Sequence, residues 1–438
     1  MTRKMKDSGI EWIGEIPEEW EVLPARYFFK ANKKIVGHKE NEYERLSLTM
    51  KGVLKKSKYN SEGLQPSNFN SYQILTKNQL VFKLIDLQNV STSRVGISPY
   101  KGLVSPAYII IDRKDTKTNN RFYYYWYMSM YLNKVFNLLG DAGVRSNINA
   151  TELLELKVPR TNFREQNIIS DFLDKKTEQI ENTKSTILQE IQTLEAYKKS
   201  VITEAVTKGL DKNVEMKDSG IEWIGEIPKS WKVTKVKYIG KLQNGISKNA
   251  KYFGKGYPFI SYGDVYKNNS LPDEVNGLVE STFSEQALYS VKKGDVFFTR
   301  TSETLEEIGY SSVSLKNFEK ATFAGFLIRL RPYKSSAILP NYSKYYFRSE
   351  HLREYLAKEM TIVTRASLGQ QLLNDMVVLL PNIEEQKIII NYLDKKCKLI
   401  DDLIAIKKKQ LEILEEYKKS LIYEYVTGKK EVNDGEET

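Results

Sequence analysis

The side chains of this 438-residue chain that could do chemistry are basic and amide groups in turn-rich stretches. Lys binds a phosphate as a point charge, whereas Arg, Asn and Gln can form the bidentate hydrogen bonds that distinguish guanine and adenine in the major groove. Each such residue, taken alone, also fits a solvated surface position. A net charge of +11 and a pI near 9.1 nevertheless indicate a polyanionic partner. The candidate DNA-binding residues are Lys51, Lys55, Lys58, Arg94, Arg145, Asn147, Lys248, Lys251, Tyr252, Lys255, Lys267, Arg300, Arg365 and Gln370.

The sequence contains no recognisable catalytic motif. A methyltransferase motif built on Pro-Pro is absent because the chain has no Pro-Pro pair, and the glycines at 254–256 and 428 lack the upstream glycine of a phosphate-binding loop. Pro272-Asp273 has no Glu-x-Lys companion nearby, so a nuclease centre has little support. One cysteine, Cys397, and two histidines cannot build a disulfide framework or a Cys/His zinc site. We therefore expect no catalytic residue and no metal site.

The composition is that of a multi-domain globular protein. A hydrophobic content of 41% excludes wholesale disorder, and 28 tyrosines favour sheet-rich portions beside the helices. Apolar runs stay short of the roughly 18 residues that a membrane span needs, and the N-terminus lacks the apolar core of a signal peptide. We expect a cytoplasmic protein with no membrane contact.

A long polar helix occurs twice and must position these residues. One copy, from about 164 to 207, contains EQNIISDFLDKK from Glu165, and the other, from about 384 to 427, contains EQKIIINYLDKK from Glu385. Apolar residues recur at spacings of three and four, as in a coiled-coil seam. At about 1.5 Å per residue each copy would measure about 60 Å, and its natural partner is its duplicate. The predicted helix-pairing residues are Leu173, Ile180, Ile187, Ile191, Leu194, Leu393, Ile400, Ile404, Leu411 and Leu414, with Val201, Ala205 and Leu421 extending the seam.

A tryptophan-bearing string is also repeated. MKDSGIEWIGEIP begins at Met5 and again at Met216, and each copy is followed by a second tryptophan, Trp20 or Trp231. We call residues 5–22 and 216–233 the tryptophan segments. Because buried aromatic rings mostly supply core area, we favour a packing role over a binding role.

Each tryptophan segment leads into a region of mixed strand and turn character, at about 23–158 and 234–380. Strands are predicted at LVFKLI from Leu80, AYIII from Ala107, DVFFTR from Asp295 and FLIRLR from Phe326, with helices near 121–139 and 342–359. Both regions end in a strand closed by proline, but they share little other sequence. The layout predicts a fixed scaffold that carries two different surfaces.

The duplication restricts the geometry. For the two helices to pair, the second must run antiparallel to the first and end beside the first globular region, which makes the two chain ends neighbours. We therefore expect an α+β fold with two mixed α/β domains separated by a long antiparallel two-helix coiled coil, related by a pseudo-two-fold internal repeat.

In combination these motifs resemble the specificity subunit of type I restriction-modification systems. The resemblance is carried by IEWIGEIPEEW and IEWIGEIPKSW, the proline-closed strand before REQ or EEQ, the following LDKK, and the endings YKKSVITEAVT and YKKSLIYEYVT. It covers the whole chain in family order. The implied parts are target recognition domains at 1–158 and 211–380, conserved helical spacers at 159–210 and 381–430, and an acidic tail at 431–438.

The resemblance implies that each globular domain binds one half of a bipartite double-stranded DNA target. It further implies two methyltransferase subunits docked on and around the helical spacer, and two restriction subunits in the full complex. S-adenosylmethionine, ATP and Mg²⁺ are expected in these partner subunits, with no cofactor in this chain. The alternatives are a stand-alone nuclease or methyltransferase and a coiled-coil protein-protein scaffold.

Overall fold

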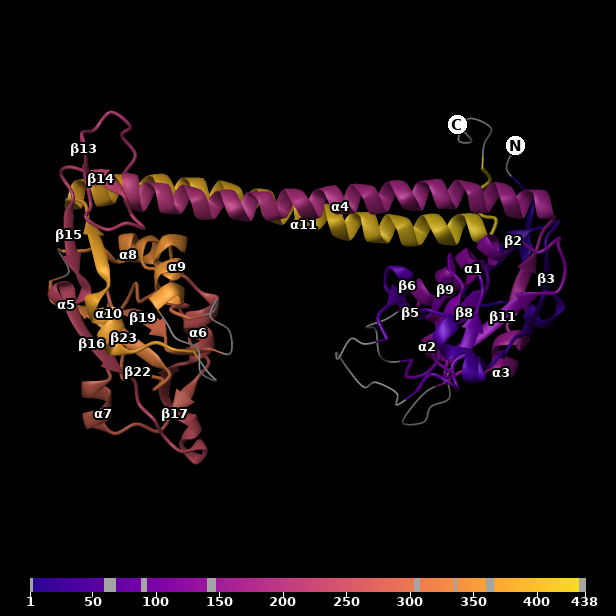
Figure 1. Ribbon diagram of the computed structural model, residues 1–438, viewed down its shortest axis with the longest axis horizontal. Coiled ribbons are helices and arrows are strands. Elements are labelled where there is room, and N and C mark those ends of the chain that lie inside the picture. Colours follow the sequence, from indigo (N-terminus) through magenta and orange to yellow (C-terminus); the bar gives the residue numbers. More distant parts are fainter. Residues whose placement is uncertain are drawn as a thin grey trace. The chain divides into compact units, whose positions relative to one another are not determined.

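The computed structural model describes residues 3–58, 68–87, 93–139, 147–302, 308–334, 337–359 and 366–432 (Figure 1). The chain forms two compact units. Unit 1 comprises Met1–Ile187 and Lys408–Thr438, and unit 2 comprises Leu188–Lys407. Two long helices, α4 (Phe163–Lys208) and α11 (Ile383–Val426), contribute to both, so each unit combines one globular region with a stretch of each helix.

Unit 1 contains two four-stranded sheets, in the orders β4-β11-β8-β9 and β6-β5-β10-β7, and the strand pairs β1-β2 and β12-β3. The strands are β1 (Met5–Asp7), β2 (Glu15–Pro17), β3 (Glu21–Pro24), β4 (Phe29–Ala31), β5 (Arg45–Thr49), β6 (Gly52–Lys56), β7 (Gln73–Leu75), β8 (Leu80–Phe82), β9 (Val95–Ile97), β10 (Gly102–Val104), β11 (Ile109–Arg113) and β12 (Lys157–Arg160). The shorter helices are α1 (Asn120–Leu132), α2 (Val135–Leu139), α3 (Ala150–Glu155) and the 3₁₀ turns η1 (Ala25–Tyr27) and η2 (Gly37–Glu42).

Unit 2 contains a four-stranded sheet in the order β16-β23-β19-β21, a three-stranded sheet β18-β17-β22, and the pairs β13-β14, β15-β25 and β20-β24. The strands are β13 (Met216–Asp218), β14 (Glu226–Pro228), β15 (Lys232–Lys235), β16 (Gly240–Asn244), β17 (Phe253–Ile260), β18 (Leu278–Val279), β19 (Val296–Thr299), β20 (Thr301–Ser302), β21 (Ser311–Val313), β22 (Thr322–Phe323), β23 (Leu327–Pro332), β24 (Ala366–Ser367) and β25 (Val377–Leu380). The shorter helices are α5 (Val236–Ile239), α6 (Tyr262–Lys267), α7 (Phe283–Leu288), α8 (Pro340–Tyr346), α9 (Glu350–Glu359), α10 (Gln370–Asp375) and the 3₁₀ turn η3 (Ala250–Tyr252).

The same four-stranded sheet is built twice. In unit 1, β11 pairs antiparallel with β4 and β8, and in unit 2, β23 pairs antiparallel with β16 and β19. All residues of β8 and β19 are buried, which explains why both strands read as continuous apolar runs. The tryptophan segments repeat as well, because β1-β2 and β13-β14 form the same short antiparallel pair. The predicted internal repeat is therefore confirmed at the level of sheet topology.

Within each unit a stretch of α4 lies alongside a stretch of α11 and runs antiparallel to it (Figure 1). In unit 1 the ion pairs Glu181–Lys418 (2.7 Å) and Lys184–Glu415 join the helices, and in unit 2 the ion pairs are Glu190–Lys407 (2.8 Å) and Lys198–Asp401 (2.6 Å). Residue numbers rise along one helix while they fall along the other, as the antiparallel prediction requires. Of the ten predicted pairing residues, seven are buried and three are half-buried. The buried ones are Leu173, Ile180, Ile187, Ile191, Leu393, Ile400 and Ile404, and the half-buried ones are Leu194, Leu411 and Leu414.

Each tryptophan segment packs where one long helix begins and the other ends. In unit 1 the Trp20 indole N–H donates to Glu165 Oε2 of α4 at 3.0 Å, and Gly428, just after α11, packs against Trp20. In unit 2 the Trp231 indole N–H donates to Glu385 Oε1 at 2.8 Å, and Gly209, just after α4, packs against Trp231. Both rings are buried, so the packing role predicted for these tryptophans is confirmed.

The repeated EQ and LDKK motifs fix the long helices to the globular regions. The buried Gln166 side chain accepts from the backbone N–H of Asn119 before α1, and Gln386 accepts from Leu339 before α8, both at 2.9 Å. The aspartate of LDKK then accepts a tyrosine hydroxyl: Asp174 from Tyr125 at 2.7 Å and Asp394 from Tyr345 at 2.6 Å. These hydrogen bonds give each repeated motif a structural role.

Several predicted elements differ in their limits. The tyrosine-rich helix expected at 121–139 is split into α1 and α2, with Lys134 in the left-handed region at φ 58°, and the helix expected at 342–359 is split into α8 and α9. The strand expected from Phe326 begins at Leu327, and Phe326 lies in the preceding turn. Single-sequence periodicity predicted the type of each element but not its breaks, which depend on tertiary packing.

Candidate nucleic-acid interface

In unit 1 the predicted lysines gather at the β5-β6 hairpin. Lys51 is exposed in its turn, and Lys55 of β6 forms an ion pair with Glu44 at 2.6 Å, which raises the pKa of the Lys55 ammonium. The Lys55 ammonium also lies 5.3 Å from the Tyr100 ring centroid. Lys58 is half-buried and donates to the Glu40 carbonyl at 2.5 Å. The hairpin thus presents cations next to aromatic rings, a combination suited to phosphate and base contacts.

The remaining predicted residues of unit 1 lie elsewhere. Exposed Asn147 accepts from the backbone N–H of Asp86 at 3.0 Å and so fixes a loop. Arg94 is only 2% exposed, and its guanidinium donates to the backbone carbonyls of Lys83, Ile85 and Asp86 at 2.8–3.3 Å. A side chain so enclosed offers no surface to a ligand. The prediction of Arg94 as a DNA contact is therefore wrong for this conformation, because the guanidinium organises the 83–86 loop instead.

In unit 2 a short loop brings together four of the predicted residues. The ammonium groups of Lys248 and Lys251 lie 5.2 and 5.0 Å from the Tyr252 ring centroid, and Lys255 follows in β17. Lys248 forms an ion pair with Glu285 at 2.7 Å, and this hydrogen bond lowers the pKa of the Glu285 carboxyl. Lys251 and Lys255 are exposed, whereas Lys248 is half-buried. We call residues 247–255 the lysine-tyrosine loop.

A second set of unit 2 residues lies at one end of the β16-β23-β19 sheet. Half-buried Arg300 directly follows β19, and its backbone N–H donates to the Phe326 carbonyl at 2.9 Å. Gln370 Nε2 donates to Asn244 Oδ1, at the end of β16, at 2.9 Å. We call Asn244, Arg300, Phe326 and Gln370 the strand-end cluster. It adjoins the lysine-tyrosine loop, because a Cβ placed on Gly325 would lie 2.3 Å from the Ser247 hydroxyl.

Two predicted arginines, Arg145 and Arg365, lie outside the described residues. Lys267 is exposed at the end of α6 and belongs neither to the lysine-tyrosine loop nor to the strand-end cluster. Sequence reasoning missed further basic residues over rings, among them Arg45 at 5.7 Å from Phe69, Lys101 at 5.2 Å from Tyr43, and Lys320 at 5.5 Å from Tyr257. The interleaving of lysine and tyrosine that marks 248–267 also occurs at Tyr100-Lys101, so this signal was available in the sequence.

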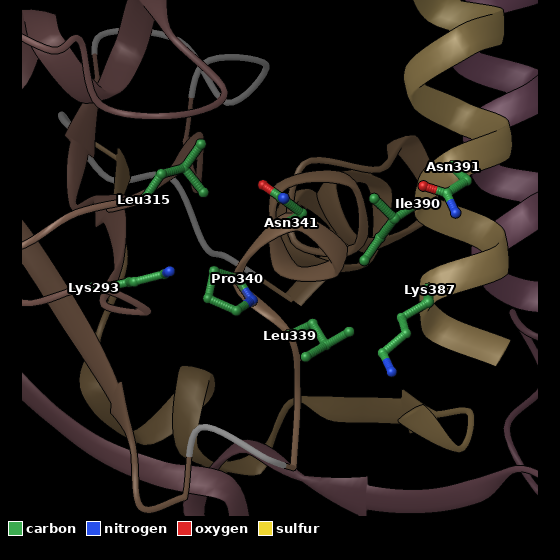
Figure 2. A pocket seen from close by; sticks show the side chains of 8 residues that line it. All are labelled: Lys293, Leu315, Leu339, Pro340, Asn341, Lys387, Ile390 and Asn391. Atoms are coloured by element: carbon green, nitrogen blue, oxygen red, sulfur yellow. The ribbon is translucent and has the colours of Figure 1, made fainter. Parts of the chain in front are cut away.

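A pocket of about 460 Å³ in unit 2 contains none of the predicted residues (Figure 2). Two ammonium groups, of Lys293 and Lys387, and two amides, of Asn341 and Asn391, line it around apolar side chains. Lys387 comes from α11, where it forms an ion pair with Glu384 at 2.7 Å. The pocket therefore places two ammonium groups near the start of the long helix.

Neither a membrane span nor a metal site is found in the part of the chain that the structure describes. None of its helices is both long and apolar enough to cross a bilayer. No cluster of three or more His, Cys, Asp or Glu side chains is placed to hold a metal ion among those residues. Cys397 is buried in the helix seam, and burial raises the pKa of its thiol, as expected for a packing residue.

Two units that repeat one scaffold and differ in their basic and aromatic surfaces define a duplicated recognition protein. The family model of the type I restriction modification DNA specificity domain matches residues 17–193 and 228–429. The chain belongs to this family, and its mixed helix and sheet fold with a repeated domain is the one that the sequence predicted.

Two relatives match over nearly the whole chain. The chain is 25% identical over 95% of both chains to the putative type I restriction enzyme MjaX specificity subunit of Methanocaldococcus jannaschii. It is 24% identical to the MjaVIII specificity subunit of the same organism, over 94% of this chain and 93% of the other. A solved chain from "Structural basis underlying complex assembly and conformational transition of the type I R-M system" has a TM-score of 0.70 at 12% identity, covering 94% of this chain and 98% of that one. The HsdS subunit from Thermoanaerobacter tengcongensis has a TM-score of 0.51 at 14% identity, with the same coverage.

Proposed function

We propose that this chain is the DNA sequence-specificity subunit of a type I restriction-modification complex and that each unit binds one half-site of a bipartite double-stranded DNA target. The observation that carries the proposal is the duplicated scaffold, in which the same sheet order and the same tryptophan joint occur twice. The surfaces on the two copies differ. A binding protein with two different half-sites needs this combination, because a shared scaffold fixes the geometry while distinct side chains read distinct bases.

The exposed cations support the DNA-binding part of this proposal. Lys51 and Lys55 in unit 1, and Lys251 and Lys255 in unit 2, offer charge to phosphates, while Gln370 and Arg300 can hydrogen-bond base edges. Lys55 and Lys255 each have a carboxylate partner within 3.2 Å, so their contribution requires the phosphate to compete with Glu44 or Glu280. Surface ion pairs of this kind contribute only about 0–1 kcal/mol, and a phosphate can replace them.

A second apolar stripe on α11 supports the docking of methyltransferase subunits on the helical spacer. In unit 2 five large apolar residues of this helix are exposed, and four of them directly precede a buried residue. One residue corresponds to about 100° of helix rotation, so the stripe lies beside the seam rather than opposite it. Adjacent apolar seams are typical of a helix in a bundle of more than two helices. The stripe residues are Ile388, Tyr392, Leu399, Leu403 and Ile406.

The first helix lacks most of this stripe. At an offset of 220 residues, Leu399, Leu403 and Ile406 correspond to Gln179, Thr183 and Thr186 of α4. The apolar stripe is therefore a property of α11 and not of the duplicated helix as such, which favours a partner helix packed along α11.

We further propose two methyltransferase subunits and, in the full complex, two restriction subunits, with S-adenosylmethionine, ATP and Mg²⁺ bound by these partners.

The proposal is tested by mapping methylated adenines across the genome of a host that expresses this chain with its methyltransferase partner. The expected result is methylation of a single bipartite motif that is absent when the methyltransferase is expressed alone. Methylation of the same motif without this chain would reject the role in specificity. A host that expresses an unrelated specificity subunit with the same methyltransferase provides the control, since its motif should differ.

A further inference from the structure

The turn before β23 presents a phenylalanine to solvent. The backbone N–H of Leu327 donates to the Ala324 carbonyl at 3.0 Å and closes a four-residue turn with Phe326 as its third residue. The Phe326 side chain is 61% exposed. A ring at this exposure is accessible to a ligand, and an aromatic side chain buries a large area when it makes a contact.

The backbone of this turn is held from both sides. The N–H of Gly325 donates to the Ile246 carbonyl at 2.8 Å, and the Phe326 carbonyl accepts from Arg300 at 2.9 Å. A Cβ on Gly245 would lie 2.2 Å from the carbonyl oxygens of Phe323 and Ala324, so glycine is required for this close approach. Because the turn is already ordered, placing the ring against a ligand costs little additional conformational entropy.

Groups that can read base edges lie at the same end of the sheet as this turn. Phe326 belongs to the strand-end cluster with Arg300 and with Gln370, which donates to Asn244. Arg and Gln form the hydrogen bonds that distinguish guanine and adenine, and an aromatic ring provides the apolar contact that detects the thymine methyl group. The cluster therefore combines the chemistries needed to discriminate base pairs in one small area.

Unit 1 has the same turn without the ring. Tyr108 N–H donates to the Ser105 carbonyl at 3.1 Å, and this turn leads into β11, which has the same place in its sheet as β23. The third residue of that turn is Ala107. The scaffold therefore accepts either residue, and the two units differ at the tip of the turn.

We propose that Phe326 is a specificity-determining residue of unit 2 and that its ring contacts a base pair of the half-site that this unit reads. The inference rests on the proposed function, since it requires unit 2 to bind DNA. Arg300 and Gln370 hydrogen-bond neighbouring base edges in this arrangement. Phe326→Ala gives unit 2 the residue that unit 1 carries at this position, so the turn should fold.

The experiment compares Phe326→Ala with Tyr333→Ala in the complete methyltransferase complex. Tyr333 is 65% exposed and follows the other end of β23, so it is an equally exposed aromatic residue at the far end of the same strand. Adenine methylation is mapped genome-wide for wild type and both variants, and thermal unfolding is recorded for each. We expect Phe326→Ala to lose about tenfold discrimination at one base pair in one half of the motif. The complex that contains Tyr333→Ala should methylate the same motif as the wild-type complex.

An unchanged motif in a folded Phe326→Ala complex would overturn the inference, and so would equal weakening of both half-sites. If Phe326→Ala lowers the unfolding temperature, Phe326→Leu keeps apolar bulk and separates the two effects. If Phe326→Leu retains the discrimination between base pairs and Phe326→Ala loses it, the result supports a contact between the Phe326 side chain and a base pair. If both variants keep full discrimination, the inference is overturned. Failure of the proposed function is distinguishable, because the wild-type complex itself would then show no motif that depends on this chain.

Discussion

Substitution of two adjacent residues of α11 should have different consequences, one for the stability of the chain and the other for its assembly with the methyltransferase. Ile400 is 2% exposed and lies in the seam with α4, whereas Leu399 is 56% exposed on the stripe beside it. Ile400→Ala removes three buried carbons, worth about 2.4 kcal/mol at about 0.8 kcal/mol each, and the cavity that remains brings the expected loss to about 2–5 kcal/mol. Leu399→Ala removes a side chain that is less than half buried, so we expect a loss of about 1 kcal/mol at most.

The two variants are compared by urea unfolding of the isolated chain, followed by far-ultraviolet circular dichroism, and by co-purification with the methyltransferase partner. Because the chain has two units, transition midpoints are compared rather than one extrapolated free energy. Ile400→Ala should lower a midpoint clearly, while Leu399→Ala should unfold near the wild-type midpoint but assemble more weakly.

Either of two results would refute the reasoning. If both variants lost stability equally, Leu399 would be part of the core rather than of a free stripe. If Leu399→Ala assembled as well as wild type, and Leu399→Glu did so too, the stripe would not be the docking surface for the methyltransferase.

Three further predictions concern the assembled complex. Its affinity for DNA should fall at least about tenfold between about 50 and 200 mM salt, because phosphate contacts release counterions, and equal affinities would contradict this. A circular permutant that joins Lys430 to Met5 and opens new chain ends near Lys212 should modify the same motif, because the Arg3 Nε and Glu431 Oε1 atoms lie 3.6 Å apart. Failure of this permutant to assemble would reject the prediction that the two chain ends are neighbours. One heptad inserted after Leu188 in α4 and one after Gln410 in α11 should lengthen the helical spacer by about 10 Å. The unread segment of the DNA motif should then gain about three base pairs while both half-sites keep their sequence. An unread segment of unchanged length would contradict the idea that helix length sets the distance between the half-sites.

The long helices and their pairing were predictable because their signal is local and repeated. Spacings of three and four placed Leu173 and Leu393 in the seam, and two copies of one helix implied an antiparallel partner. The burial of Trp20 and Trp231 was also predictable from their repeated apolar surroundings. Their hydrogen bonds to Glu165 and Glu385 were not, because these acceptors are 145 and 154 residues away in the sequence.

The globular regions were less predictable, since their strands are short and pair over long sequence distances. β10 pairs parallel with β5, and β17 pairs parallel with β22, and no local pattern specifies such neighbours. The sequence does not predict the burial of Arg94, because its carbonyl partners come from a separate loop. The turn that contains Gly325 and Phe326 is not predicted either, because Phe326 begins an apolar run that is typical of a strand.

The most direct test of the central claim is an exchange of residues 234–380 for the corresponding region of another family member, followed by genome-wide mapping of methylated adenines in a host that supplies the methyltransferase. Both tryptophan joints lie outside the exchanged region, so the hydrogen bonds of Trp20 to Glu165 and of Trp231 to Glu385 should be preserved. Independent reading by the two units predicts that one half of the bipartite motif changes while the other half is retained. A change in both halves, or in neither, would contradict the assignment of one half-site to each unit.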